Sequence, residues 1–256
     1  MHFWTASLGK GSVIFLGIMM IMYAVYKPKK RWMTLLIGSF LVYMVRPHIM
    51  FFVMTGITIG YLTGKEKIKP ATRFFILLLM ILFLILAGNK ILQVVNLENS
   101  ENLAQDFLEY SELQSQRLSE ASGSGVDMNN YPLPLKFFTF WFRPLFFDAP
   151  NFLGIFTSVE NLLYLFIFLK VFRWDFLIFV RKSNRMVKMA FITFFLTTFA
   201  MTFLMSNLGI IMRQKSQVMY FAFYVIFYYL AQKQAYKKYM YKKYLEKQRK
   251  AKLVKA

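Results

Sequence analysis

Residues 74–87 read FFILLLMILFLILA, a stretch in which every side chain is apolar, and the apolar segment around it extends over 74–95. Six other apolar segments lie at about 12–26, 32–45, 49–63, 152–172, 187–206 and 217–232. A helix needs about 20 apolar residues to cross a bilayer, and continuous runs of this kind differ from the alternating pattern of a soluble core. We therefore predict an all-α, polytopic transmembrane bundle of about seven helices. The segments 32–45 and 49–63 are short and could form a shallow hairpin.

The composition excludes several classes of site. The chain has no cysteine, which rules out disulfides, thiolate metal sites and thiol catalysis. His2 and His48 are the only histidines in the sequence, so we expect no multi-histidine metal centre.

The net charge of +20 would suggest a nucleic-acid partner in a soluble protein. Here ten Lys and Arg residues lie in the tail, 233–256, after the last apolar segment. Such a tail is typical of a cytoplasmic anchor that touches anionic lipid headgroups. We therefore expect membrane lipids as partners and no nucleic acid. The tyrosine-rich part from Tyr236 to Tyr244 predicts an amphipathic helix that lies against the membrane.

Basic clusters predict the orientation of the bundle, 1–232. They lie in the connections at 27–31, 65–73 and 170–188, in addition to the tail. All four regions fall on one side if the seven helices alternate across the membrane, and positive charge marks the cytoplasmic side. The C-terminus is therefore predicted to be cytoplasmic.

The other side then receives the N-terminus, the Arg46-Pro47-His48 turn, the 207–216 connection and one long extracytoplasmic loop at 96–151. Within that loop, residues 100–121 predict a surface helix. The prediction rests on Leu103, Phe107, Tyr110 and Leu113, which recur at helical spacing. An ordered loop of this length between short-looped helices is often a lid or a binding element.

An N-terminus on that side without a basic, cleavable leader is unusual. Either the first helix inserts in the reversed sense, or the chain begins part-way through a larger protein. We favour the second alternative.

Arg46 and Arg143 each stand alone before a proline, on the side where positive charge is scarce. Proline suits the first turn of a helix, so each arginine is predicted to precede a helix whose amide groups face it. A helix N-terminus beside a guanidinium group forms a site for an anion, and arginine suits the forked contacts of phosphate. A single arginine of this kind is more often an interfacial anchor than a ligand. Two of them in Arg-Pro turns, with a third on the same face, favour a shared anion site.

The third arginine, Arg213, lies with Lys215 in the turn between the last two apolar segments, where both are expected to face the outer surface. Asn207 is expected to end the preceding helix as a C-cap. Glu160 lies about two turns into the 152–172 segment. It could act as a general base, although an ion pair with Lys90 or with an arginine is the plainer role. His48 could transfer protons near neutral pH or could simply hydrogen-bond the turn.

Taken in order, these elements resemble the bacterial O-antigen and exopolysaccharide polymerases. The resemblance covers nearly the whole chain and rests on the order and common face of its motifs, not on any single one. They are Phe3-Trp4, Leu8-Gly9-Lys10, Arg46-Pro47-His48, Phe142-Arg143-Pro144, Glu160-Asn161 and Asn207-Leu-Gly-Ile-Ile-Met-Arg213. Members of that family usually have more helices ahead of the part that corresponds to Phe3.

The resemblance implies a multi-pass protein of the bacterial inner membrane that transfers an undecaprenyl-pyrophosphate-linked glycan at the outer face. It implies pyrophosphate binding by Arg46, Arg143 and Arg213, together with Lys215, and a catalytic base in His48 or Glu160. Such a reaction needs an aligned donor and stabilisation of the charge that grows on the pyrophosphate, which arginines can supply without a metal or cofactor.

Two other functions remain open. The chain could be a transporter or flippase of lipid-linked oligosaccharides, or a non-catalytic subunit that works with other polysaccharide-assembly proteins. A transporter needs polar positions through the bundle, whereas the charges here gather at one face. The sugar, its linkage and the oligomeric state are not encoded in any motif.

Overall fold

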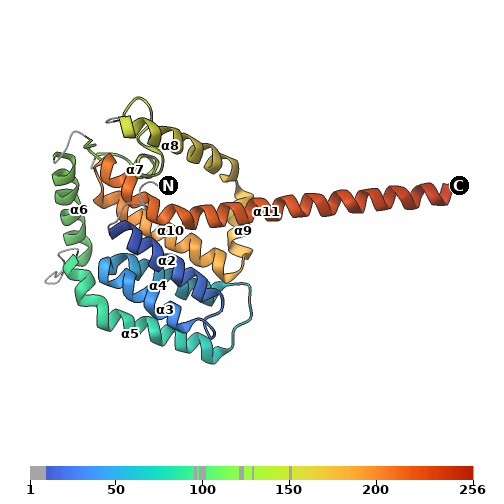
Figure 1. The fold of residues 1–256 in the computed structure, drawn as a ribbon, viewed down its shortest axis with the longest axis horizontal. Coiled ribbons are helices and arrows are strands. Elements are labelled where there is room, and N and C mark those ends of the chain that lie inside the picture. Colours follow the sequence, from blue (N-terminus) through green and yellow to red (C-terminus); the bar gives the residue numbers. More distant parts are fainter. Residues whose placement is uncertain are drawn as a thin grey trace.

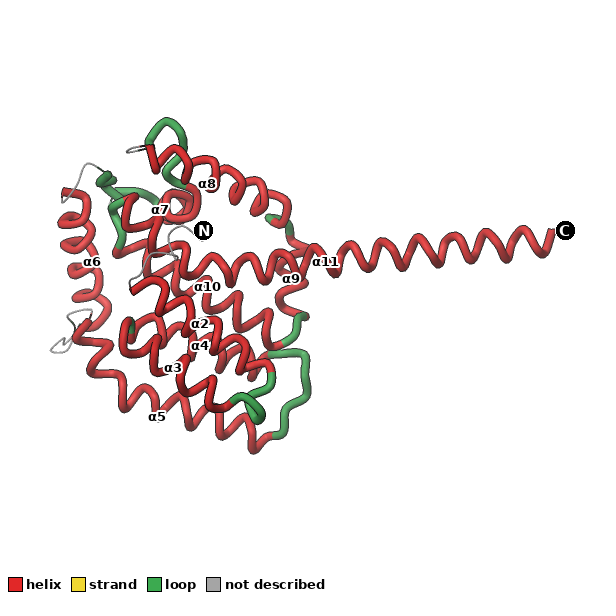
Figure 2. Tube along the Cα trace, viewed as in Figure 1, coloured by secondary structure: helices red, strands yellow, loops and turns green. Residues whose placement is uncertain are grey.

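The computed structural model describes residues 10–94, 97, 102–120, 124–128, 130–149 and 152–255. Over these residues the protein is all-helical (Figure 2), and the one pairing of extended backbone is an isolated bridge between Gly125 and Asn207. The all-α prediction is confirmed. The motifs predicted at Phe3-Trp4 and Leu8-Gly9 lie outside the described residues.

Each of the seven apolar segments forms a helix. These helices are α2 (Lys10–Tyr26), α3 (Trp32–Val45), α4 (Pro47–Thr63), α5 (Pro70–Val94), α8 (Phe152–Val171), α10 (Arg185–Leu204) and α11 (Leu208–Lys255). Three more helices lie between them: α6 (Leu103–Glu120), α7 (Leu133–Phe142) and α9 (Trp174–Lys182).

Three of the helices are long and apolar enough to cross a membrane, over Pro70–Lys90, Gly154–Val171 and Arg185–Leu204. The prediction of about seven spanning helices is therefore met only in part. The helices α2, α3 and α4 are apolar but have 17, 14 and 17 residues. They are too short to reach the usual spanning length of about 20 residues.

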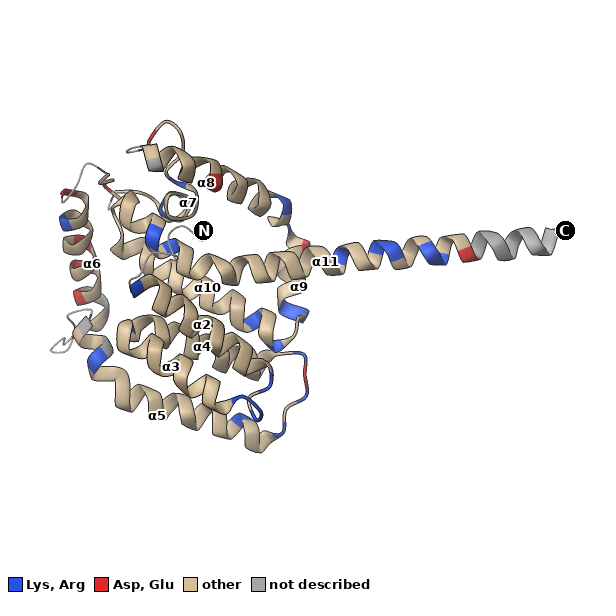
Figure 3. Cartoon of the chain, viewed as in Figure 1, with Lys and Arg blue, Asp and Glu red and all other residues tan. Residues whose placement is uncertain are grey.

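The basic connections meet at one end of the bundle. Figure 3 shows the Lys and Arg residues between α2 and α3, between α4 and α5, and from α8 to α10 at the end from which α11 projects. Direct contacts join these connections: Lys65 N donates to Ser183 O at 3.3 Å, and the Arg185 guanidinium lies 4.7 Å from the ring of Tyr61. We call this the basic end. The α3–α4 turn, α6 and the start of α11 lie at the opposite end (Figure 1).

Small residues allow the helices of the bundle to approach closely. A Cβ on Gly17 of α2 would lie 2.7 Å from Val42 of α3 and 2.9 Å from the backbone of Gly38. A Cβ on Gly56 of α4 would overlap Thr193 of α10. Contacts of this kind between small residues are the common way in which membrane helices pack.

The surface helix predicted over 100–121 is confirmed as α6. Leu103 and Leu113 are about half exposed and Phe107 and Tyr110 are partly buried, whereas Ser111 and Ser115 are buried. Ser115 hydrogen-bonds Ser206 after α10, and Val126 N donates to Ser206 O at 2.8 Å. The face of α6 that carries these serines therefore meets polar groups at the end of α10.

The tail is a direct continuation of α11. Residues 208–255 form one helix, whose last part projects away from the bundle (Figure 1). The helix predicted over Tyr236–Tyr244 is therefore confirmed as part of α11, and its placement against the membrane stays a prediction. No proline interrupts this stretch, and Lys, Ala, Gln, Leu and Glu, which favour helix, fill much of it.

Candidate functional site at the opposite end

Arg46 joins two helices. Its amide donates to Val42 O at the end of α3, and its carbonyl accepts from Ile49 N at 3.1 Å at the start of α4, where Pro47 occupies the first turn. The predicted Arg-Pro helix start is confirmed here. The Arg46 guanidinium then donates a hydrogen bond to Gln214 Oε1 of α11, 168 residues away in the chain. Burial lowers the pKa of this guanidinium, so its charge requires nearby acceptors.

Lys215, next to Gln214, is buried with 3% of its surface exposed. Its Nζ donates to Asn161 Oδ1 at 2.5 Å, to Trp141 O at 3.2 Å and to Arg143 O at 3.3 Å. The prediction that Lys215 faces the outer surface is therefore wrong. Its ammonium group links three segments, namely the end of α7, the first half of α8 and the start of α11.

The reason for this burial is the register of α11. Lys215 shares one face of the helix with the buried Ile211, Met219 and Ala222, at spacings of three and four residues. Arg213, two residues earlier, falls on the far side and is exposed. Only one of the two basic residues predicted here therefore enters the site.

Asn161 and Glu160 bring α8 into the same site. Asn161 is fully buried, and its Nδ2 donates to Pro144 O at 2.8 Å while its Oδ1 accepts from Lys215. Glu160 Oε1 accepts a hydrogen bond from the Tyr164 hydroxyl at 2.5 Å, and its carboxylate interacts electrostatically with Lys215. Lys90, one partner expected for Glu160, instead lies 4.8 Å from the ring of Tyr43.

The backbone and the side chain of Arg143 have different partners. Its carbonyl accepts from Lys215, and its side chain forms an ion pair. The guanidinium binds Asp148, whose other carboxylate oxygen accepts from Leu145 N at 2.5 Å. Burial alone would lower the pKa of Arg143, but hydrogen bonds with Asp148 and Tyr131 raise it above its ordinary value.

The predicted helix start at Arg143-Pro144 is wrong. Arg143 ends α7 in an extended conformation, and residues 143–149 form loop and turn structure. The side-chain carboxylate of Asp148 closes this turn by bonding both the Arg143 guanidinium and Leu145 N, so the chain does not enter a helix after Pro144.

Asn207 begins α11 instead of ending α10. Its Oδ1 accepts from Ile210 N at 3.2 Å and from the Ser124 hydroxyl at 3.0 Å, and its Nδ2 donates to Leu118 O. The predicted C-cap is therefore wrong. Asparagine satisfies free amide groups at a helix start as readily as it fits a helix end.

His48 lies in the first turn of α4, close enough to Arg46 for their charges to interact. Its Nδ1 is a buried atom with no hydrogen-bond partner among the described residues, as are Gln217 Oε1, Thr139 Oγ1 and Trp141 Nε1. These atoms come from α4, α7 and α11, the helices that also supply Arg46, Trp141 O and Lys215. Buried polar atoms are nearly always satisfied in proteins, so such a group points to a bound polar molecule or water.

The structure thus brings Arg46, Lys215 and Glu160, three of the predicted site residues, to the opposite end, with His48 beside Arg46. We call Arg46, Gln214, Lys215, Asn161 and Glu160 the polar cluster. It has two parts, Arg46 with Gln214 and Lys215 with Asn161 and Glu160, which adjoin through consecutive residues of α11. Its cations can attract an anion, and its carboxylate can accept a proton. Over the described residues, no three His, Asp or Glu side chains lie together as metal ligands would. Sequence reasoning missed Gln214 and Asp148, which become recognisable only through their partners.

No protein-family model, curated protein or solved structure matches this chain. The function is therefore argued from the polar cluster and its setting.

Proposed function

We propose that this chain is a membrane-embedded glycan polymerase, or a related glycosyltransferase. Its substrate would be a glycan linked to undecaprenyl pyrophosphate, bound at the end opposite the basic connections. The observation that carries this proposal is a pair of polar contacts on consecutive residues of α11: Gln214 bonds Arg46, and Lys215 bonds Asn161 and interacts with Glu160. An ionisable residue held at the level of a membrane is costly and usually has a function.

The pyrophosphate would bind near Arg46. Arg46 is the residue directly before α4, whose N-terminus favours an anion, and a forked contact from arginine to phosphate oxygens is strong. Lys215 already donates to three oxygen acceptors, so it would hold the walls of the site and supply positive potential rather than bind phosphate alone. Together these charges would stabilise the pyrophosphate as it leaves.

Glu160 is the better placed of the two predicted bases. The Tyr164 hydroxyl donates a hydrogen bond to its carboxylate and orients it, and the carboxylate interacts electrostatically with Lys215. In the proposed reaction Glu160 takes the proton of the acceptor hydroxyl, whose oxygen bonds to the anomeric carbon of the donor sugar. The bond between that carbon and the pyrophosphate oxygen breaks, and the pyrophosphate departs with its electron pair. His48 would then orient Arg46 or the substrate through its unpartnered Nδ1.

Arg143 and Arg213 have less direct places in this proposal. The Arg143 guanidinium is paired with Asp148, so a phosphate group must compete with that carboxylate to bind it. Arg213 is exposed on the far side of α11 and would attract anionic substrate from a distance. The proposal therefore ranks Arg46 first among the three arginines.

The threonines of α10 do not favour transport through the bundle. Thr198 and Thr202 donate to carbonyl oxygens of their own helix, and Thr193 packs against Gly56. A non-catalytic role in polysaccharide assembly is the second candidate, because the projecting part of α11 offers an isolated helix to another protein.

The test is polymer length in bacterial cells that lack the locus for this chain. We expect the wild-type chain to restore long polymer and Arg46→Lys to abolish it, because lysine cannot form the forked contact. Arg117→Lys, on the exposed face of α6, is the matched control and should restore polymer fully. Full activity of Arg46→Lys at equal protein level would refute the proposal.

A further inference from the structure

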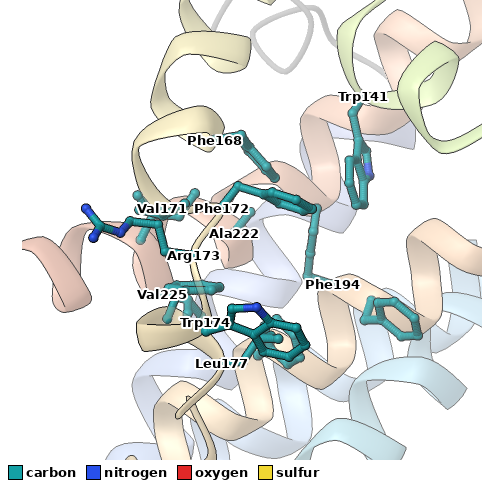
Figure 4. A pocket seen from close by; sticks show the side chains of 14 residues that line it. Trp141, Phe168, Val171, Phe172, Arg173, Trp174, Leu177, Phe194, Ala222 and Val225 are labelled. Carbon is teal, nitrogen blue, oxygen red and sulfur yellow. The ribbon is translucent and has the colours of Figure 1, made fainter. Parts of the chain in front are cut away.

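A cavity of about 400 Å³ lies between α8, α9, α10 and α11 (Figure 4). No residue of the polar cluster lines it, although the carbonyl of one wall residue, Trp141, accepts a hydrogen bond from Lys215. Its walls include Trp141, Phe168, Val171, Phe194, Ala222 and Val225. The volume falls within the range of about 300–1,000 Å³ that is usual for ligand sites. Protein interiors otherwise contain few voids larger than a water molecule, so a cavity of this size requires an explanation.

The chemistry of the walls favours hydrocarbon over water. Aromatic rings form much of the surface, and Trp141 lies 5.6 Å from Phe194 and 5.6 Å from Phe168 between ring centroids. A buried water needs two to four polar partners, whereas these walls present almost only carbon. An apolar chain is therefore the better occupant.

One end of the cavity reaches the surface at the connection between α8 and α9. Phe172 and Trp174 line the cavity there, and they are 87% and 80% exposed. Large exposed aromatic side chains beside basic residues are typical of the boundary between lipid tails and headgroups. In Figure 1, α9 runs across the direction of α10 and α11, as an interfacial helix does.

Arg173 is the charged residue that lines the cavity. Figure 4 shows its aliphatic stem beside the cavity and its guanidinium pointing away from it. The surroundings are also positive, because Lys170, Arg181 and Lys182 lie in the same segment with Asp175 as the nearby acid. An apolar chamber with a cation at its mouth is complementary to an anionic amphiphile.

We propose that this cavity binds one acyl chain of an anionic phospholipid from the leaflet at the basic end, with the lipid phosphate held at Arg173. The site is distinct from the polar cluster and does not depend on the proposed glycan transfer. The chain of the lipid would pack between α8 and α10, and the helix α9 would lie along the headgroups.

The experiment uses tryptophan quenching by brominated lipids. The full chain with Trp4, Trp32 and Trp174 changed to Phe retains Trp141, which lines the cavity. In nanodiscs with rising fractions of dibromo-phosphatidylglycerol or dibromo-phosphatidylcholine, we expect half-maximal quenching at a several-fold lower fraction of the anionic lipid. Arg173→Gln should remove this preference. Arg181→Gln, at the same end but outside the lining, should keep it.

A cavity-filling change separates binding from folding. Ala222→Phe should abolish the high-affinity quenching and the phospholipid retained in native mass spectrometry, while the thermal unfolding temperature stays equal or rises. Equal quenching by both lipids would overturn the proposal, as would equal behaviour of Arg173→Gln and Arg181→Gln. Displacement of the bromolipid by undecaprenyl phosphate but not by phosphatidylglycerol would also overturn it, because the occupant would then be a polyprenyl chain.

Discussion

The two ends of the bundle differ in where their charged side chains lie. At the basic end, Lys and Arg side chains stay at the surface, and the connections touch through single contacts such as Lys188 Nζ to Thr63 O. At the opposite end, Lys215 is buried and bonds two backbone oxygen atoms at the end of α7 and the side chain of Asn161. Surface charges can set orientation at little cost, whereas a buried cation must be matched by acceptors. The difference separates residues that orient the protein from residues that build a site.

The largest expected effect concerns the orientation of the two ends. The chain has no cysteine, so single cysteines can be placed at Gln116 on α6 and at Lys67 between α4 and α5, both exposed. We expect a membrane-impermeant maleimide to label Gln116→Cys in intact spheroplasts and Lys67→Cys only after permeabilisation. The opposite labelling would place the basic end outside, and the basic connections would then not mark the cytoplasmic side.

Removal of the buried ammonium group should cost the most stability. Lys215→Met leaves Trp141 O, Arg143 O and Asn161 Oδ1 without their donor, and Glu160 without its cation. Loss of one partner of a buried charged pair costs about 3–5 kcal/mol. Lys182→Met, an exposed residue of the basic end, should change stability by no more than about 0.5 kcal/mol. Thermal unfolding in detergent compares the two, and equal losses would mean that Lys215 is not a structural centre.

The two asparagine caps give a matched pair. Asn184 caps α10 at the basic end, where Val187 N donates to its Oδ1 at 2.9 Å, and Asn207 caps α11 at the opposite end. Loss of a cap costs about 1 kcal/mol, so Asn184→Ala should show a loss of that size. Asn207 also bonds Ser124 and Leu118, so Asn207→Ala should cost about 2 kcal/mol. A larger loss for Asn184→Ala, in the same unfolding measurement, would show that the opposite end is the less ordered of the two.

The smallest expected effect concerns the ion pair between Arg143 and Asp148. Its removal tests whether the Arg143 guanidinium can bind a pyrophosphate group. Asp148→Asn removes the carboxylate that now binds its guanidinium, at a cost of about 1–2 kcal/mol in stability. If a pyrophosphate group competes with Asp148, the variant should bind farnesyl pyrophosphate up to about tenfold more tightly, as measured by isothermal titration. Unchanged or weaker binding would restrict the anion site to Arg46 and Lys215.

Periodicity and charge predicted much of this architecture. The seven apolar segments became helices because each holds enough apolar side chain to be buried or to face lipid, and proline placed the start of α4 at Arg46. The burial of Lys215 could also have been inferred, since it falls in register with Ile211 and Met219. Its acceptors could not, because they are backbone oxygens whose positions depend on how α7 meets α11.

Contacts between residues far apart in the sequence could not be predicted from local sequence patterns. The bond between Arg46 and Gln214 depends on the packing of whole helices, and no property of either residue selects the other. The pairing of Arg143 with Asp148 is a different case, because only five residues separate the two. There the proline suggested a helix start, and the nearby carboxylate made a closed turn instead.

The unbroken course of α11 has a mechanical consequence. One helix holds Lys215 inside the opposite end, crosses the bundle and continues as the projecting tail, over a length of about 70 Å. A rod without a hinge cannot turn at one end and stay still at the other. A partner that binds the lysines of the tail and rotates or tilts it would therefore also move the part of α11 that holds Lys215 against Asn161.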